Sequence, residues 1–141
     1  MTRSKIYILT AVMLFTAAVA VSFGVGRMTS QKKERISYSK WPQVQFKDVR
    51  ILIASDAQLA NQGFAGAEEK DFEKTLMIFP GILPGTSFTN QNQGYGPVTA
   101  DLKIVFLDRN MNVLKEDAMA KETGTSTAPE GTFLAVEGPL Y

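Results

Sequence analysis

A mainly β fold, built as a small rolled sheet or barrel of five to six strands with one short helix, is predicted by two features of the sequence. Segments of strand length alternate apolar and polar residues at residues 44–53 and 102–107, which is the period of a half-buried strand. Turn-forming residues close such segments, as Pro80-Gly81 does after the apolar run TLMIF at residues 75–79. Short strands separated by turns in this way are typical of rolled sheets and small barrels.

The first part of this domain is expected to pass from strand to helix. The alternation in residues 44–53 changes phase at Asp48, which predicts one strand with a bulge or two short strands. Ser55 or Asp56 is a suitable N-cap for the helix, and Gly63 stands where that helix would end.

The second part is expected to contain a hairpin and a closing strand. Residues 102–107 lead into the turn Asp108-Arg109-Asn110, and residues 113–114 resume the apolar pattern. A last strand is predicted at residues 132–136, after a loop rich in Gly, Ser, Thr and Pro.

The segment at residues 6–26 contains no charged residue and, as a helix, would be about 31 Å long, the thickness of a bilayer core. Arg3 and Lys5 precede it, and a basic segment follows it. We therefore expect a cytoplasmic tail at residues 1–5 and an uncleaved, single-pass transmembrane anchor at residues 6–26.

A cleaved signal peptide is the alternative, because Ala18-Val19-Ala20 resembles a cleavage site. The apolar run is longer than a signal peptide usually has, which favours the anchor. Residues 27–41 are polar and basic and are interpreted as a linker, and residues 42–141 as the soluble domain. The short basic tail favours an extracytoplasmic domain, although a strict count of cations would place it in the cytoplasm.

The composition excludes several classes of function. The net charge of +1 argues against nucleic acid as a partner, and the absence of Cys excludes disulfides and thiolate chemistry. The absence of His removes the commonest general base near neutral pH and the commonest metal ligand. We expect no cofactor and no metal site.

Two kinds of candidate site are left. Paired carboxylates could hydrolyse a glycosidic bond, and the candidates in or beside strands are Asp56, Asp101, Asp108 and Glu137. The alternative is a binding site in the polar loop at residues 88–95, whose amides and aromatic rings suit a sugar or a peptide backbone. The candidate ligand-binding residues are Phe88, Asn90, Asn92, Tyr95 and Asp101.

The order of these pieces resembles the bacterial and archaeal family called domain of unknown function 192. Its members share an Ala-Asp-Thr helix start, a Met-Leu-Phe-Val-Phe strand, a Phe-Trp-Met-Lys-Asn-Thr segment and a strand ending in Ile-Phe-Ile-Asp. The matching segments here are Ala54-Ser55-Asp56 with Gly63-Phe64-Ala65, and residues 75–79, 88–93, 102–108 and 129–138. In the third of them, only Phe88 and Asn92 keep the family residue. The resemblance implies the fold of a divergent member and little chemistry.

The sequence thus predicts a membrane-anchored, non-catalytic domain that binds a small ligand, a glycan or a protein at the membrane surface. A carboxylate-based hydrolase and a structural component of an envelope complex are the alternatives. The bilayer and an unknown ligand or protein are the expected partners.

Overall fold

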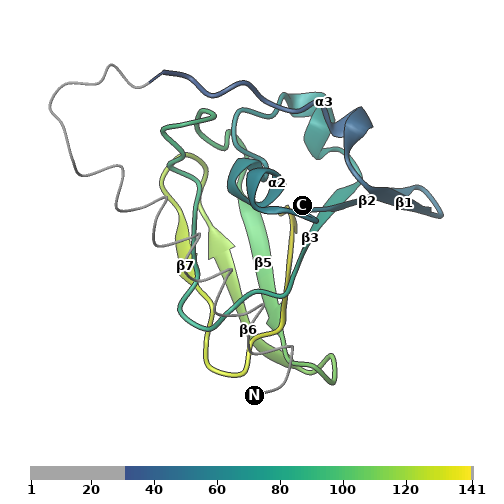
Figure 1. The fold of residues 1–141 in the computed structure, drawn as a ribbon, viewed down its shortest axis with the longest axis vertical. Helices are drawn as coiled ribbons and strands as arrows, with labels where there is room; N and C mark the ends of the chain where they lie inside the picture. Colours follow the sequence, from purple (N-terminus) through teal and green to yellow (C-terminus); the bar gives the residue numbers. More distant parts are fainter. Residues whose placement is uncertain (1–30, 141) are drawn as a thin grey trace, which may run out of the picture. The chain divides into compact units, whose positions relative to one another are not determined.

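A mixed six-stranded sheet dominates the computed structural model, which describes residues 31–140 (Figure 1). The strands run in the order β1-β2-β3-β8-β5-β6, with β2 and β3 parallel and every other neighbouring pair antiparallel. This confirms a mainly β fold. The sheet is open, with β1 and β6 at its edges, so it is not a closed barrel. Its strands are β1 (Gln43–Phe46), β2 (Val49–Ile53), β3 (Thr75–Pro80), β5 (Leu102–Leu107), β6 (Val113–Met119) and β8 (Leu134–Pro139).

Two short α-helices are present within residues 31–140, although the sequence pattern predicts only one. Helix α2 (Ala57–Gln62) begins as predicted, because the side chain of Asp56 accepts a hydrogen bond from the backbone N–H of Leu59 at 2.9 Å. It ends at Gly63, whose φ of 48° suits a residue without a Cβ. A 3₁₀ turn, η2 (Tyr38–Lys40), precedes the sheet.

The second helix, α3 (Glu69–Phe72), was not predicted, so the expectation of a single helix is wrong. Its N-terminus is a capping box. The side chain of Asp71 accepts a hydrogen bond from the backbone N–H of Glu68, and the side chain of Glu68 accepts one from the backbone N–H of Asp71. Both capping residues are acidic, which favours the N-terminus of a helix.

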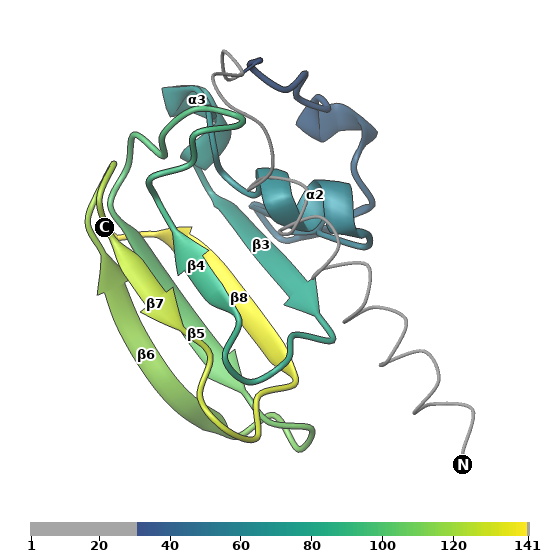
Figure 2. The same ribbon diagram turned by 60° about the vertical axis from the view of Figure 1, so that its left-hand side comes forward.

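A small second sheet pairs β4 (Ser87–Thr89) with β7 (Thr125–Thr127) in antiparallel fashion. Figure 2 shows this pair lying over one face of the large sheet, in front of β5 and β8. The ring of Phe88 in β4 contacts those of Phe79 and Phe106, with centroid separations of 5.1 and 5.7 Å. The small sheet therefore closes the core over the β3-β8-β5 region.

The core lies between one face of the large sheet and the segments that cover it. Alternate residues of β2, β3 and β5 point into it, including Leu52, Met77 and Ile104, each with no exposed surface. The turn after α2 also reaches this face, because a side chain at Gly63 would contact Phe79 and Met77. We call this the core face of the sheet.

The packed domain begins before Pro42, where the sequence analysis placed its boundary. The backbone N–H of Lys33 donates to the carbonyl oxygen of Gly94 at 2.9 Å, and the rings of Tyr38 and Trp41 are buried in the core. Part of the segment interpreted as a linker is therefore structural. The predicted tail, anchor and first residues of the linker lie outside the described residues. Within residues 31–140, no helix is both long enough and apolar enough to cross a membrane.

Candidate functional site

The candidate residues of the polar loop are held by internal contacts. Phe88 is a core aromatic, in contact with the two rings described above. The side chain of Asn90 is buried, and its Nδ2 donates to the carbonyl oxygens of Met119 at 3.1 Å and Ala120 at 2.9 Å. Both residues thus tie β4 to the rest of the fold.

The other two candidate residues of the loop, Asn92 and Tyr95, are not exposed, whereas Gln91 and Gln93 of the same loop are. Asn92 is half-buried: its Oδ1 accepts the backbone N–H groups of Gly94 and Tyr95, and its Nδ2 donates to Asn61 at 3.0 Å. Tyr95 is buried, with the Nζ of Lys33 5.6 Å from its ring centroid. The loop is folded inward because its amides satisfy backbone groups that would otherwise be buried without partners.

Asn90→Ala is expected to lower the free energy of unfolding by about 2–3 kcal/mol, because the buried amide loses its bonds to the carbonyl oxygens of Met119 and Ala120. Chemical denaturation of the variant measures this cost. Gln91→Ala is the matched control, since Gln91 is exposed and its effect should stay within about 0.5 kcal/mol. An Asn90→Ala protein as stable as wild type would show that the amide is free for another role.

The four candidate carboxylates do not come together as a pair. Asp56 caps α2, and Asp101 accepts the backbone N–H of Lys121 at 2.8 Å. Asp108 accepts the backbone N–H groups of Asn110 and Asn112 in the β5–β6 turn, and the Asn112 contacts hold its pKa below the usual range. Glu137 is buried on the core face of β8, in register with Met77 and Ile104.

An open hollow of about 1020 Å³ borders α3 and the start of β5. Glu68, Glu69, Glu73 and Asp101 line it, together with Lys70. The Nζ of Lys70 lies 2.7 Å from Glu68 and keeps the pKa of that carboxyl low, whereas a general acid needs a raised pKa. Glu137, whose pKa burial raises, is not among the lining residues. The hollow thus does not bring together the acid and base that the hydrolase alternative requires.

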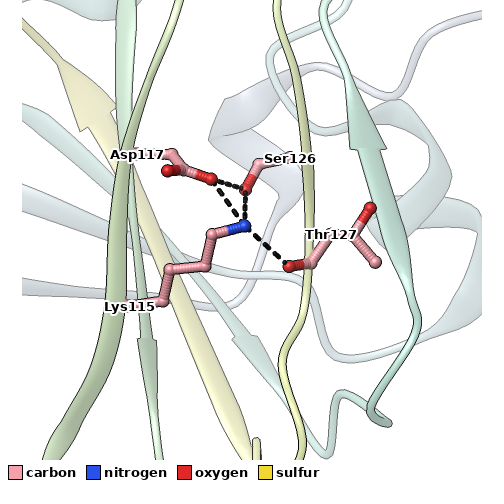
Figure 3. A network of polar contacts seen from close by, with 4 residues as sticks. All are labelled: Lys115, Asp117, Ser126 and Thr127. Atoms are coloured by element: carbon pink, nitrogen blue, oxygen red, sulfur yellow. Dashed lines mark hydrogen bonds and ion pairs between the residues drawn. The ribbon is translucent and has the colours of Figure 1, made fainter.

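A polar network joins β6 to β7, and its residue types could suggest a serine nucleophile (Figure 3). Ser126 Oγ donates to Asp117, and Lys115 Nζ lies 2.8 Å from Asp117 and 3.5 Å from Ser126 Oγ. The Nζ of Lys115 is paired with Asp117 and also donates to the carbonyl oxygen of Thr127 at 3.2 Å, so its hydrogen-bonding capacity is used within the fold. Lys115 and Ser126 lower the pKa of Asp117, which weakens it as a base. The network therefore links β6 of the large sheet to β7 of the small sheet.

The face of the large sheet opposite the core carries a continuous set of apolar side chains. In-register pairs such as Ile51 with Leu76 and Ile78 with Val136 continue this set from strand to strand. Val44, Phe46 and Leu76 are exposed and the other members are half-buried, whereas Leu134, in register with Leu107 at one end of this face, is buried. We call this set the outer face; it comprises Val44, Phe46, Val49, Ile51, Ile53, Leu76, Ile78, Val105, Leu107 and Val136.

Two ion pairs lie beside the outer face, and the Nζ of Lys47 lies 5.7 Å from the ring centroid of Phe46 at its edge. Lys103 of β5 pairs with Glu116 of β6 at 2.6 Å, and Lys74 pairs with Asp48 at 2.9 Å near the starts of β3 and β2. Helix α2 and the small sheet lie on the opposite side, against the core face. An antiparallel sheet that keeps one face in water normally shows polar residues there. The outer face departs from that pattern.

Sequence reasoning did not identify the outer face, although one signal was present. The run TLMIF at residues 75–79 has apolar residues at consecutive positions, which is typical of a strand buried on both faces. The alternation of β2 similarly places Val49, Ile51 and Ile53 on one face while Leu52 enters the core on the other. Recognising the surface required the strand order, because it joins segments far apart in the chain.

Comparisons with known proteins give a structural likeness and no family. No family model matches this chain, and no curated protein matches it. The fold is similar to the crystal structure of a protein of unknown function from Novosphingobium aromaticivorans, with a TM-score of 0.49 and 19% sequence identity. The match covers 69% of this chain and 70% of that one.

Proposed function

We propose that this chain is a non-catalytic assembly domain, held at a membrane by its apolar segment at residues 6–26, which associates through the outer face. The observation that supports this function is the uncovered set of apolar side chains on five adjacent strands. The largest exposed apolar patch of a typical monomer measures about 300–600 Å², and such a patch is often a functional surface. The function is that of a structural component at a membrane, one of the two alternatives to ligand binding.

Ligand binding by the polar loop is less well supported. The amides of Asn90 and Asn92 already bond to backbone groups, and the ring of Tyr95 is buried. A glycan would have to displace these contacts before it could bind. The outer face requires no such rearrangement.

The point at which the chain joins the packed domain supports close attachment to the bilayer. Because Lys33 is bonded to Gly94, at most residues 27–32 separate the proposed anchor from the packed domain. Six residues span at most about 20 Å when fully extended. The domain would therefore stay near the headgroups, on the extracytoplasmic side in our proposal, where neighbouring molecules share a two-dimensional surface.

Solvent protection of the outer face tests the proposed function. The chain has no Cys, so Leu76→Cys and Leu83→Cys each introduce a single thiol. These leucines are almost equally exposed within the domain, at 37% and 38%, but only Leu76 lies on the outer face. In opened membranes containing the full chain, a bulky water-soluble maleimide should label residue 76 at least several-fold more slowly than residue 83. Equal rates would mean that the face is bare and the proposal is wrong.

A further inference from the structure

We infer that the partner on the outer face is a second copy of this chain, packed sheet against sheet about a two-fold axis. The inference rests on the proposed function, which makes the outer face the association surface. It adds the identity of the partner. Three properties of the face support it: its size, its charge and its shape.

The outer face comes close to the size of the smallest specific interfaces. It spans five strands spaced about 4.8 Å apart, each contributing about 15 Å of length, so its projected area is on the order of 400 Å². Protruding side chains such as Phe46 make the accessible surface larger than this projection. The accessible area of the outer face thus approaches the roughly 600 Å² per partner that is buried at the lower end of specific protein interfaces. Attachment to one membrane would raise the effective concentration of the two copies.

The charge pattern suits a copy of the same face better than a charged partner. The two adjacent ion pairs, Lys103 with Glu116 and Lys74 with Asp48, are each neutral. A second outer face brings mainly apolar groups and the same neutral pairs, and the exposed ammonium of Lys47, 5.7 Å from the ring centroid of Phe46 at the edge of the face, can stay in water. A surface that binds anionic lipid usually combines its apolar residues with many cations on an adjoining polar face.

The shape of the face is also matched by symmetry. Strands in a sheet twist with a fixed hand, and two sheets of similar twist stack face to face about 10 Å apart at roughly 30°. A second copy has the same twist by necessity. Two such copies would form a four-layer assembly, with each small sheet and α2 on the outside.

Cross-linking of single thiols in membranes containing the full chain tests the inference. Leu76→Cys and Val136→Cys place the thiol on two neighbouring central strands, so the test covers an axis that passes near either strand. A short bis-maleimide should convert at least one of them into a covalent dimer of twice the 15.5 kDa mass. Leu83→Cys, the control, should give at least tenfold less dimer.

The remaining outcomes contradict the inference in different ways. Cross-linking of residue 76 or 136 to a protein of another mass would show a different partner. Protection of residue 76 from the bulky maleimide without a dimer from either variant would show that something other than a second copy covers the face. Both results leave the proposed association function standing. Equal labelling of residues 76 and 83 would overturn that function and this inference together.

Discussion

A chain that begins at Pro42 is expected to be largely unfolded at 25 °C, whereas a chain that begins at Lys32 should fold. The missing segment carries Tyr38 and Trp41, which are 4% and 3% exposed and pack edge to face with ring centroids 5.3 Å apart. The hydroxyl of Tyr38 also donates to the carbonyl oxygen of Gly63 at 2.7 Å. Burial raises the pKa of this phenol to about 12, so it remains a donor at all physiological pH values.

Removing a large aromatic side chain from a core costs about 3–5 kcal/mol. Losing two of them takes away most of the 5–15 kcal/mol that stabilises a typical domain. Thermal unfolding followed by circular dichroism compares the two chains. Ser39→Ala in the longer chain is the control, because Ser39 is exposed and its side chain contacts only that of Ser37. Equal melting temperatures for the two chains would show that residues 32–41 are not part of the folded unit.

The second large effect is a loss of stability with rising pH that originates at Glu137. Burial raises the pKa of this carboxyl from 4.5 to about 8, because its register neighbours Met77 and Ile104 offer nothing polar to the charged form. Above pH 4.5 the unfolded chain releases the proton while the folded chain keeps it, so the folded state loses stability until about pH 8. Such a shift corresponds to a loss on the order of 5 kcal/mol.

Glu137→Gln should abolish this component of the pH dependence, since the amide keeps the size of the side chain and cannot ionise. At pH 9 the variant is expected to be more stable than wild type by several kcal/mol, and at pH 4.5 the two should be within about 1 kcal/mol. Urea denaturation across this range gives both values. Glu130→Gln is the control at an exposed carboxylate, and its difference from wild type should be small at every pH. If wild type and Glu137→Gln show parallel stability profiles, burial does not destabilise the charged form of Glu137 and this explanation is wrong.

Local patterns in the sequence were sufficient for much of the fold. The N-cap at Asp56 and the stop at Gly63 depend on residues within one helix, and the turn at Asp108 depends on five consecutive positions. The burial of Asn90 depends on carbonyl oxygens 29 and 30 residues further along the chain. A polar segment rich in amides looks the same in sequence whether its amides bond to backbone or to solvent, so its role could not be predicted.

Two expectations about the whole chain stay predictions. The resemblance to domain of unknown function 192 rests on the order of short segments, and the transmembrane anchor rests on the uncharged run at residues 6–26. Neither is needed for the outer face, which follows from the strand order and the side-chain pattern of residues 44–136. The anchor affects only how readily two copies would meet.

Co-isolation of two differently tagged full-length chains tests the central claim, association of two copies through the outer face, most directly. When both are expressed in one cell and extracted gently from membranes, capture of one tag should recover the other. Leu76→Lys in both chains places a charge in the apolar interface and should reduce this recovery at least tenfold, while Leu83→Lys should leave it unchanged. Wild-type chains that never co-isolate, or Leu76→Lys chains that co-isolate as well as wild type, would contradict the account.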